Sequence, residues 1–175
     1  MKAFPILVLL LLCVGSVFGL AGNQKKWRTA TEIELRGIIP ARATVEKERI
    51  ETEFRTASAV TDGKGRFIAG VVMITAGYSA EGKYSHFFIT HVPIRCGEVE
   101  LRPGEYVFGY KRTPQDTLEV KFYEASTGKF LGDVIAHQDP RKAPVRQLVI
   151  TSATGSEKPA VRIGRFLFEY SIAGL

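Results

Sequence analysis

The chain has 175 residues, and its 24 Lys and Arg against 18 Asp and Glu give a formal net charge of +6 at pH 7. This length is enough for one domain with a sizeable core. The basic residues are dispersed and are not interleaved with aromatic residues, which excludes nucleic acid as the expected partner. The charge favours an anionic component of a cell envelope, and the alternatives are a protein partner or an ordinary surface with a modest excess of cations.

The first 21 residues have the pattern of a secretory signal peptide. Lys2 precedes an apolar run over residues 4–12, and small residues lead to Ala21, after which we expect cleavage. The alternative is an uncleaved segment that anchors the protein to a membrane, and we expect no other membrane association. Cleavage would leave 154 residues with a net charge of +5 and would place the protein in the periplasm or the medium.

Cys96 would be the only cysteine left after cleavage, because Cys13 lies in the signal. It would have no partner for an internal disulfide, so it is either buried and inert or paired between chains. We favour burial, because cysteine is among the most buried residue types.

The beginning of the mature chain is polar. We interpret residues 22–30 as a flexible leader that docks Trp27, followed by a single domain over residues 31–175. Charged and apolar residues alternate over residues 32–36, which predicts a strand. Residues 44–60 fit a strand or an irregular helix, and their Thr and Ile content favours the strand.

Residues 67–78 are apolar on both faces, as in a central strand that is buried on two sides. Residues 79–83 predict a turn, after which residues 84–96 return as the partner strand. In this hairpin we expect Tyr78 to face Tyr84.

Residues 99–136 predict a meander of antiparallel strands. Aromatic residues alternate with Val107 and Gly109 over residues 106–110, and apolar residues alternate with charged ones over residues 118–122, so each apolar trio lies on one face of its strand. With the connecting loop centred on Pro114, the two trios pair across the hairpin. The expected pairs are Tyr110 with Leu118, Phe108 with Val120, and Tyr106 with Phe122.

Residues 137–147 contain two prolines and predict a surface loop. Strands are expected at residues 148–151 and from Val161 onward, with a bulge or tight bend at Gly164, where the alternation changes parity. Short strands with regular turn signals and no long helix indicate an all-β domain. We expect an antiparallel β-sandwich, with a closed antiparallel barrel as the alternative.

The motifs that suggest chemistry have simpler explanations. Residues 77–83 match G-x-x-x-x-G-K, but Tyr84 stands where a P-loop needs Ser or Thr and a strand follows, so we interpret the motif as a hairpin turn. His86 and His91 lie an odd number of residues apart and face opposite sides of a strand, so they cannot share a metal. The two carboxylate pairs are interpreted as solvated outer faces: Glu51 with Glu53, and Glu98 with Glu100. We expect no catalytic residue, no metal and no cofactor.

The run VELRPGEYVF at residues 99–108, followed by LEVKFYEASTG at 118–128, resembles uncharacterised secreted bacterial β-sandwich proteins that carry a Leu-x-Pro-Gly-x-Tyr turn before a hairpin. The resemblance covers about a quarter of the chain, over residues 94–136. It implies a secreted or envelope protein of a bacterium and transfers no functional residues.

We therefore expect an exported, non-enzymatic binding or structural module of the bacterial cell envelope. The alternative is a small-ligand carrier or hydrolase with a site at one end of the sandwich near residues 137–147. There, His137, Asp139 and Arg141 are the candidate ligand-binding residues. A third hypothesis is an adhesin or assembly subunit that pairs sheet edges.

Overall fold

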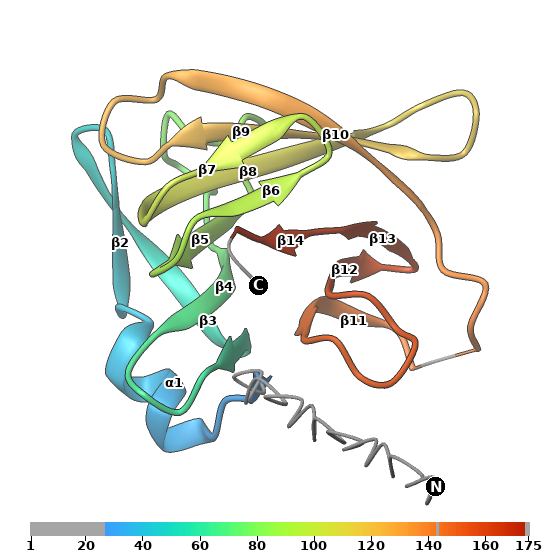
Figure 1. Cartoon of the computed structure of the whole chain (residues 1–175). Coiled ribbons are helices and arrows are strands. Elements are labelled where there is room, and N and C mark those ends of the chain that lie inside the picture. The colour runs from blue at the N-terminus through green and yellow to red at the C-terminus, as the bar shows by residue number, and fades with distance from the viewer. Residues whose placement is uncertain (1–26, 143, 174–175) are drawn as a thin grey trace, which may run out of the picture.

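The computed structural model describes residues 27–142 and 144–173, which form mainly antiparallel strands (Figure 1). The described part contains one helix, α1 (Glu32–Ile38), and no helix long and apolar enough to cross a membrane. The strands in chain order are β1 (Arg28–Thr29), β2 (Arg42–Val45), β3 (Glu48–Thr61), β4 (Phe67–Met73), β5 (His86–Thr90), β6 (Ile94–Cys96), β7 (Val99–Leu101), β8 (Gly104–Arg112), β9 (Leu118–Glu124), β10 (Phe130–Gln138), β11 (Arg146–Thr151), β12 (Ala160–Gly164), β13 (Phe166–Glu169) and β14 (Ser171–Ile172). The expected signal peptide, residues 1–21, lies outside the described residues.

Most of the strands belong to one sheet that curls into a barrel-like shape (Figure 1). Their order is β1-β3-β4-β5-β8-β9-β10-β13-β12-β11, with β2 also paired to β3. The last strand, β11, lies against β3, where the amide of Ile150 donates to Oγ of Ser58 at 2.8 Å. The expected all-β antiparallel class is confirmed, and the near-closure of the sheet corresponds to the barrel alternative.

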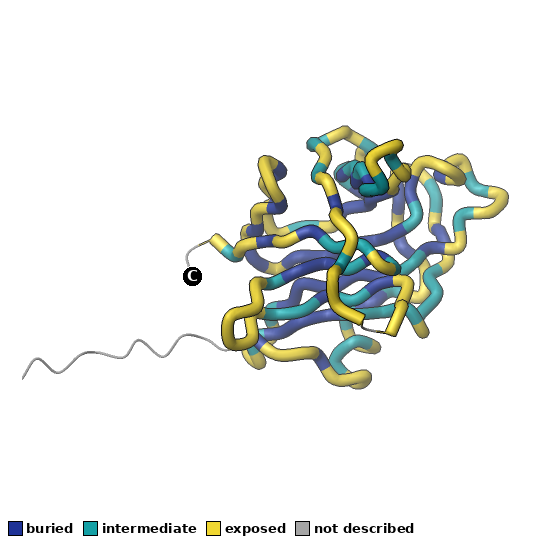
Figure 2. Tube along the Cα trace, turned by 90° about the vertical axis from the view of Figure 1, so that its right-hand side faces the viewer, coloured by how far each residue is buried: buried dark blue, intermediate teal, exposed yellow. Residues whose placement is uncertain are grey.

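Buried side chains form one cluster inside the curled sheet and a second on its outer face. The inner cluster uses alternate residues of the strands, and its largest members include Phe88, Phe108 and Phe122. The outer cluster lies between the sheet and the layer that contains α1 and β2. Strands β4 and β5 are therefore buried on both faces, and Figure 2 shows the buried strands at the centre of the molecule. This confirms the prediction of a central strand for residues 67–73, whereas residues 74–78 lie outside β4.

The predicted meander is present, but its central hairpin has a different register. The observed pairs are Tyr106 with Glu124, Phe108 with Phe122, and Tyr110 with Val120. The predicted pairs were wrong by a shift of two residues, which leaves every side chain on its predicted face.

The loop of this hairpin explains the shift. The amide of Thr113 donates to the carbonyl oxygen of Thr117 at 2.9 Å, and Asp116 adopts a φ of 56°. The loop is therefore shorter than expected, and the strands extend to Arg112 and Leu118.

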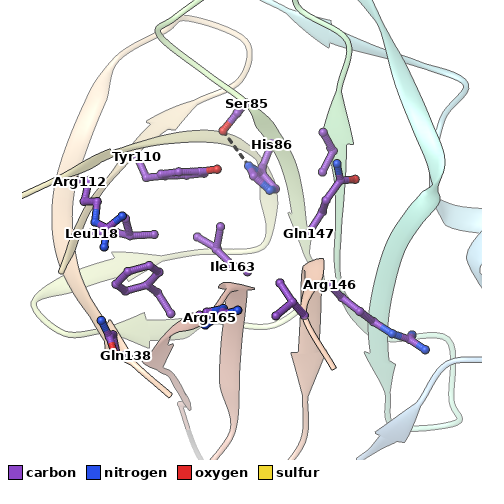
Figure 3. A pocket seen from close by; sticks show the side chains of 14 residues that line it. Ser85, His86, Tyr110, Arg112, Leu118, Gln138, Arg146, Gln147, Ile163 and Arg165 are labelled. Atoms are coloured by element: carbon purple, nitrogen blue, oxygen red, sulfur yellow. Dashed lines mark hydrogen bonds between the residues drawn. The ribbon is translucent and has the colours of Figure 1, made fainter. Parts of the chain in front are cut away.

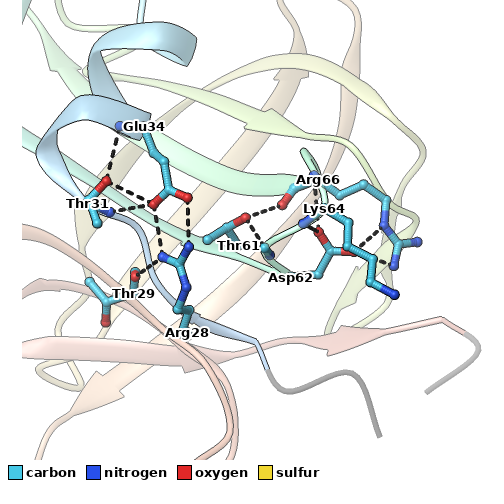
Figure 4. A network of polar contacts seen from close by, with 9 residues as sticks. Arg28, Thr29, Thr31, Glu34, Thr61, Asp62, Lys64 and Arg66 are labelled. Carbon is cyan, nitrogen blue, oxygen red and sulfur yellow. Dashed lines mark hydrogen bonds and ion pairs between the residues drawn. The ribbon is translucent and has the colours of Figure 1, made fainter. Parts of the chain in front are cut away.

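Residues 32–36, expected as a strand, belong to helix α1, so this prediction was wrong (Figure 4). The amide of Glu34 donates to Oγ1 of Thr31 at 3.3 Å, and the Glu34 carboxylate accepts from the Thr31 amide at 2.8 Å. This capping box starts the helix, and Glu34 also binds Arg28 of β1 at 2.8 Å. Only Leu35 and Ile38 of this short helix pack on the outer cluster, and both are partly buried, so two positions are too few to separate a helix from a short strand.

Residues 44–60 follow the strand interpretation, because β2 and β3 form a hairpin there. In the next hairpin, β4 ends at Met73, and the expected pairing of Tyr78 with Tyr84 was wrong: Val72 faces His86 instead. Residues 74–85 form successive turns in which Gly77 and Gly82 take positive φ angles of 84° and 74°. Strand β5 follows these turns, whereas a P-loop at residues 77–83 would be followed by a helix.

The strands β6, β7 and β14 form a small sheet where β5 ends and β8 begins. Its buried side chains, including Cys96, belong to the inner cluster, and burial raises the pKa of the Cys96 thiol to about 12. In the Leu-x-Pro-Gly-x-Tyr turn, the hydroxyl of Tyr106 donates to the carbonyl oxygen of Arg102 at 2.7 Å. This contact is a tyrosine corner, which gives the motif a structural role.

The N-terminal end of the described chain packs on the barrel. Trp27 is buried in the inner cluster and Arg28–Thr29 pair with β3, so the last residues of the expected leader lie on the domain.

Gly164 has a φ of 60° and begins the two-residue turn between β12 and β13, which confirms the expected tight bend.

Candidate functional site

A cavity of about 740 Å³ lies at the end of the barrel where β4 ends and β5 begins. At this end, the inward-facing positions of β8 change from apolar to polar. They run from Phe108 to Tyr110 and Arg112. The same alternation that fills the barrel with apolar side chains therefore places polar ones around the opening.

The walls of the cavity combine apolar and cationic groups (Figure 3). Leu118 and Ile163 are buried and provide apolar surface, with Ile163 near the centre of the view. Three arginines line the cavity as well: Arg112, Arg146 and Arg165. Such a mixture suits a ligand that is apolar at one end and negatively charged at the other.

His86 lies in the inner wall of the cavity and is 3% exposed. Its ring stacks on Phe108 with 4.6 Å between centroids, and its Nδ1 lies 2.8 Å from Oγ of Ser85. Nε2 makes no hydrogen bond to the described residues. Burial lowers the pKa of His86 to about 4, against a smaller opposing effect from the backbone of Gln147, so the ring is neutral at pH 7.

This neutral ring predicts a loss of stability in acid. Because the pKa of His86 rises from about 4 to about 6.5 on unfolding, the unfolded chain binds the proton more tightly, and stability falls between these two pH values. The full loss, reached below about pH 4, is about 3 kcal/mol, and nothing is lost above about pH 7. We expect denaturant unfolding to show this difference between wild type and His86→Phe, which keeps an aromatic ring on Phe108.

His91→Phe is the matched control, because His91 is exposed and packs edge-on against Phe67 outside the barrel. As the pH is lowered, the unfolding free energy of this variant should fall as steeply as that of the wild type. An equally steep fall in His86→Phe would show that the buried ring is not the source.

One of the cavity arginines, Arg112, is already paired with a carboxylate. Asp116 accepts from Nε of Arg112 at 2.7 Å and from the side chain of Gln138. Within residues 27–142 and 144–173, Arg146 and Arg165 make no ion pair with a carboxylate. The opening of the cavity therefore carries uncompensated positive charge.

The structure brings together two of the three candidate ligand-binding residues. Nε of Arg141 lies 2.9 Å from Oδ1 of Asp139, and Arg141 also pairs with Glu157 at 2.8 Å. His137 is exposed on β10 and lines neither the large cavity nor the hollow beside it. Because neighbouring residues of a strand face opposite sides, Gln138 lines the cavity in its place.

The carboxylate of Asp139 also forms an ion pair with Arg162 of β12. Its Oδ2 lies 2.8 Å from Nε of Arg162, an ion pair without the alignment of a hydrogen bond. The hydrogen bond from Arg141 is the main cause that lowers the pKa of this nearly buried carboxyl group. Asp139 thus ties the loop after β10 to β12 and neutralises part of the charge in a second hollow of about 390 Å³, which adjoins the cavity at Arg165.

The other motifs do not assemble a site. His86 faces the barrel interior and His91 is exposed, as predicted, and no group of three potential metal ligands occurs among the residues with assigned positions. The paired carboxylates have cationic neighbours at the surface: Glu51 with Arg42, Glu53 with Arg55, and Glu100 with Arg95.

Sequence reasoning missed Arg112, Arg146 and Arg165. A signal for Arg112 was present, because it continues the inward-facing alternation of β8 beyond Phe108 and Tyr110. No protein-family model matches the chain, and comparisons with curated proteins and with solved structures found no match.

Proposed function

We propose that the protein is an exported, non-enzymatic binding module whose ligand is a small, partly apolar molecule held in the barrel-end cavity. The observation that carries this proposal is the cavity of about 740 Å³ with apolar walls and cationic side chains at its opening. Ligand sites commonly have volumes of roughly 300–1,000 Å³ and combine apolar walls with a few polar groups.

The chemistry of the site supports binding more than catalysis. Ser85 and His86 are in contact, but no carboxylate binds Nε2 of His86 within the described chain, so the pair lacks the third group that orients a histidine base.

Export is supported by the signal-like pattern of residues 1–21. The Leu-x-Pro-Gly-x-Tyr resemblance supports a place in a bacterial envelope.

A fluorescence titration with the neutral apolar dye N-phenyl-1-naphthylamine tests the proposal on protein recovered after export. The wild type should show saturable one-to-one binding. Ile163→Trp fills the centre of the cavity and should weaken binding about tenfold or more, which is about 1.4 kcal/mol. Val145→Trp adds bulk at an exposed residue of the opening and should weaken it without straining the core.

Ile135→Trp is the matched control, because Ile135 is partly exposed on β10 and does not line the cavity. It should bind the dye as the wild type does, and thermal unfolding should show that all variants are folded. Absence of saturable binding, or undiminished binding by both cavity variants, would overturn the proposed function.

A further inference from the structure

We infer that the hollow of about 390 Å³ beside the barrel-end cavity is a second binding site, and that its ligand is a phosphate monoester group. The arginines that line this hollow are Arg141, Arg162 and Arg165. The inference goes beyond the proposed function, because it does not depend on whether the cavity itself holds a ligand. It gives a location to the anionic partner that the net charge of the sequence favours.

Asp139 contacts all three of these arginines, which come from different elements. Its Oδ1 lies 2.9 Å from Nε of Arg141 in the loop after β10, and its Oδ2 lies 2.8 Å from Nε of Arg162 on β12. Its amide donates to the carbonyl oxygen of Arg165, in the turn between β12 and β13, at 2.7 Å. The loop, the strand and the turn therefore meet at one residue beside the hollow.

Arg162 has the clearest need for an external acceptor. Its side chain is 13% exposed, and its Nε is buried without a hydrogen bond to the described residues. Among those residues its one charged partner is Asp139, and this contact lacks the alignment of a hydrogen bond. A guanidinium group carries five donors, and removing them from water without acceptors is costly. An oxyanion in the hollow would supply the missing acceptors.

The charges around the hollow favour an anion. Its lining contains one carboxylate, that of Asp139, and four cationic side chains: Arg141, Lys142, Arg162 and Arg165. The Asp139 carboxylate is 4% exposed and is occupied by two of the arginines. Lys142 and Arg165 make no ion pair with a carboxylate in the part of the chain that the structure describes. An incoming anion would therefore meet a net positive charge.

The number of donors around the hollow favours a phosphate monoester over a carboxylate. A phosphate monoester has three free oxygens and a charge of about −1.5 to −2 at pH 7, so it can accept from guanidinium groups of several elements at once. A carboxylate offers two oxygens in one plane, and Asp139 already presents such a group to Arg141 and Arg162. Inorganic phosphate, soluble phosphate esters and some lipid head groups share this chemistry.

Titration with inorganic phosphate at constant ionic strength tests the inference on protein recovered after export. The backbone amide NMR signals of Asp139 and Arg165 should shift and saturate. Acetate and the diester dimethyl phosphate are the comparison ions, and each should bind about tenfold more weakly, which is about 1.4 kcal/mol. Cosedimentation with vesicles that contain phosphatidic acid would assign the group to a lipid, and its absence would assign the group to a soluble ester.

Two variants of the hollow and one control complete the test. Arg165→Gln removes an exposed cation, and Arg162→Lys keeps the charge but loses the planar fork, so both should weaken phosphate binding. Arg95→Gln removes one charge at an exposed position outside the hollow and should bind phosphate as the wild type does. Circular dichroism should show that the variants are folded.

Three results would overturn the inference: no saturable shift with phosphate, equally tight binding of acetate, or undiminished phosphate binding by both Arg165→Gln and Arg162→Lys. None of them bears on the proposed function, which the dye titration of the cavity tests separately.

Discussion

Replacing Phe122 by alanine is expected to destabilise the protein by about 3–5 kcal/mol, the usual cost of truncating a buried phenylalanine. The ring is fully buried inside the barrel-like sheet. Its centroid lies 5.4 Å from that of Phe108, 6.3 Å from Phe88 and 5.9 Å from Phe168. These partners come from β8, β5 and β13, so one side chain fills the space between distant parts of the sheet.

Chemical denaturation monitored by circular dichroism measures this effect. Phe130→Ala is the matched control, because Phe130 is half exposed on β10 and contacts Tyr123 outside the inner cluster. Its cost should be below about 1 kcal/mol, as for most surface substitutions. Equal costs for the two variants would contradict the barrel interior described above.

Gly109→Ala is expected to destabilise the protein by roughly 3 kcal/mol or more, at or beyond the upper end of the usual cost of overpacking. A Cβ atom at this position of β8 would lie 2.2 Å from the carbonyl oxygen of Lys83 and 3.1 Å from its carbonyl carbon. Both atoms belong to the backbone, so no side-chain rotation relieves the clash.

The segment that carries Lys83 cannot move away easily. The amides of Lys83 and Tyr84 both donate to the carbonyl oxygen of Ala80 at 3.0 Å. The buried Tyr84 donates its hydroxyl to Glu46 at 2.8 Å. Relief of the clash would therefore disturb the outer cluster, which contains Tyr84.

Gly37→Ala provides the comparison, because no atom lies within 4 Å of a Cβ at this position of helix α1. It should be neutral or stabilising by up to about 1 kcal/mol, since alanine favours helix. Thermal and denaturant unfolding of both variants measure the difference. A neutral Gly109→Ala would mean that the 74–85 segment does not pack on β8 as described.

The alternation of side chains along the sequence predicted which residues of a strand share a face, but it did not predict how the strands pair. It assigned Phe108 and Phe122 to one face of the sheet, because alternation is a local property of a strand. It did not fix their register, because a shift of two residues preserves every face, and the turn around Asp116 decided the pairing. At residues 32–36 the alternation was misleading, and the capping box of Thr31 and Glu34 was the better local signal.

The sequence by itself determined the all-β antiparallel class and which side chains of β8 and β9 share the core face. The tertiary structure alone decided that the sheet curls until β11 meets β3, and that Arg146, Arg165 and His86 share one cavity. Alternation is set by the backbone geometry of single strands, whereas closure depends on the order, twist and stagger of strands far apart in the chain. For that reason the candidate pair Asp139 and Arg141 was predictable from one loop, and the cavity beside it was not.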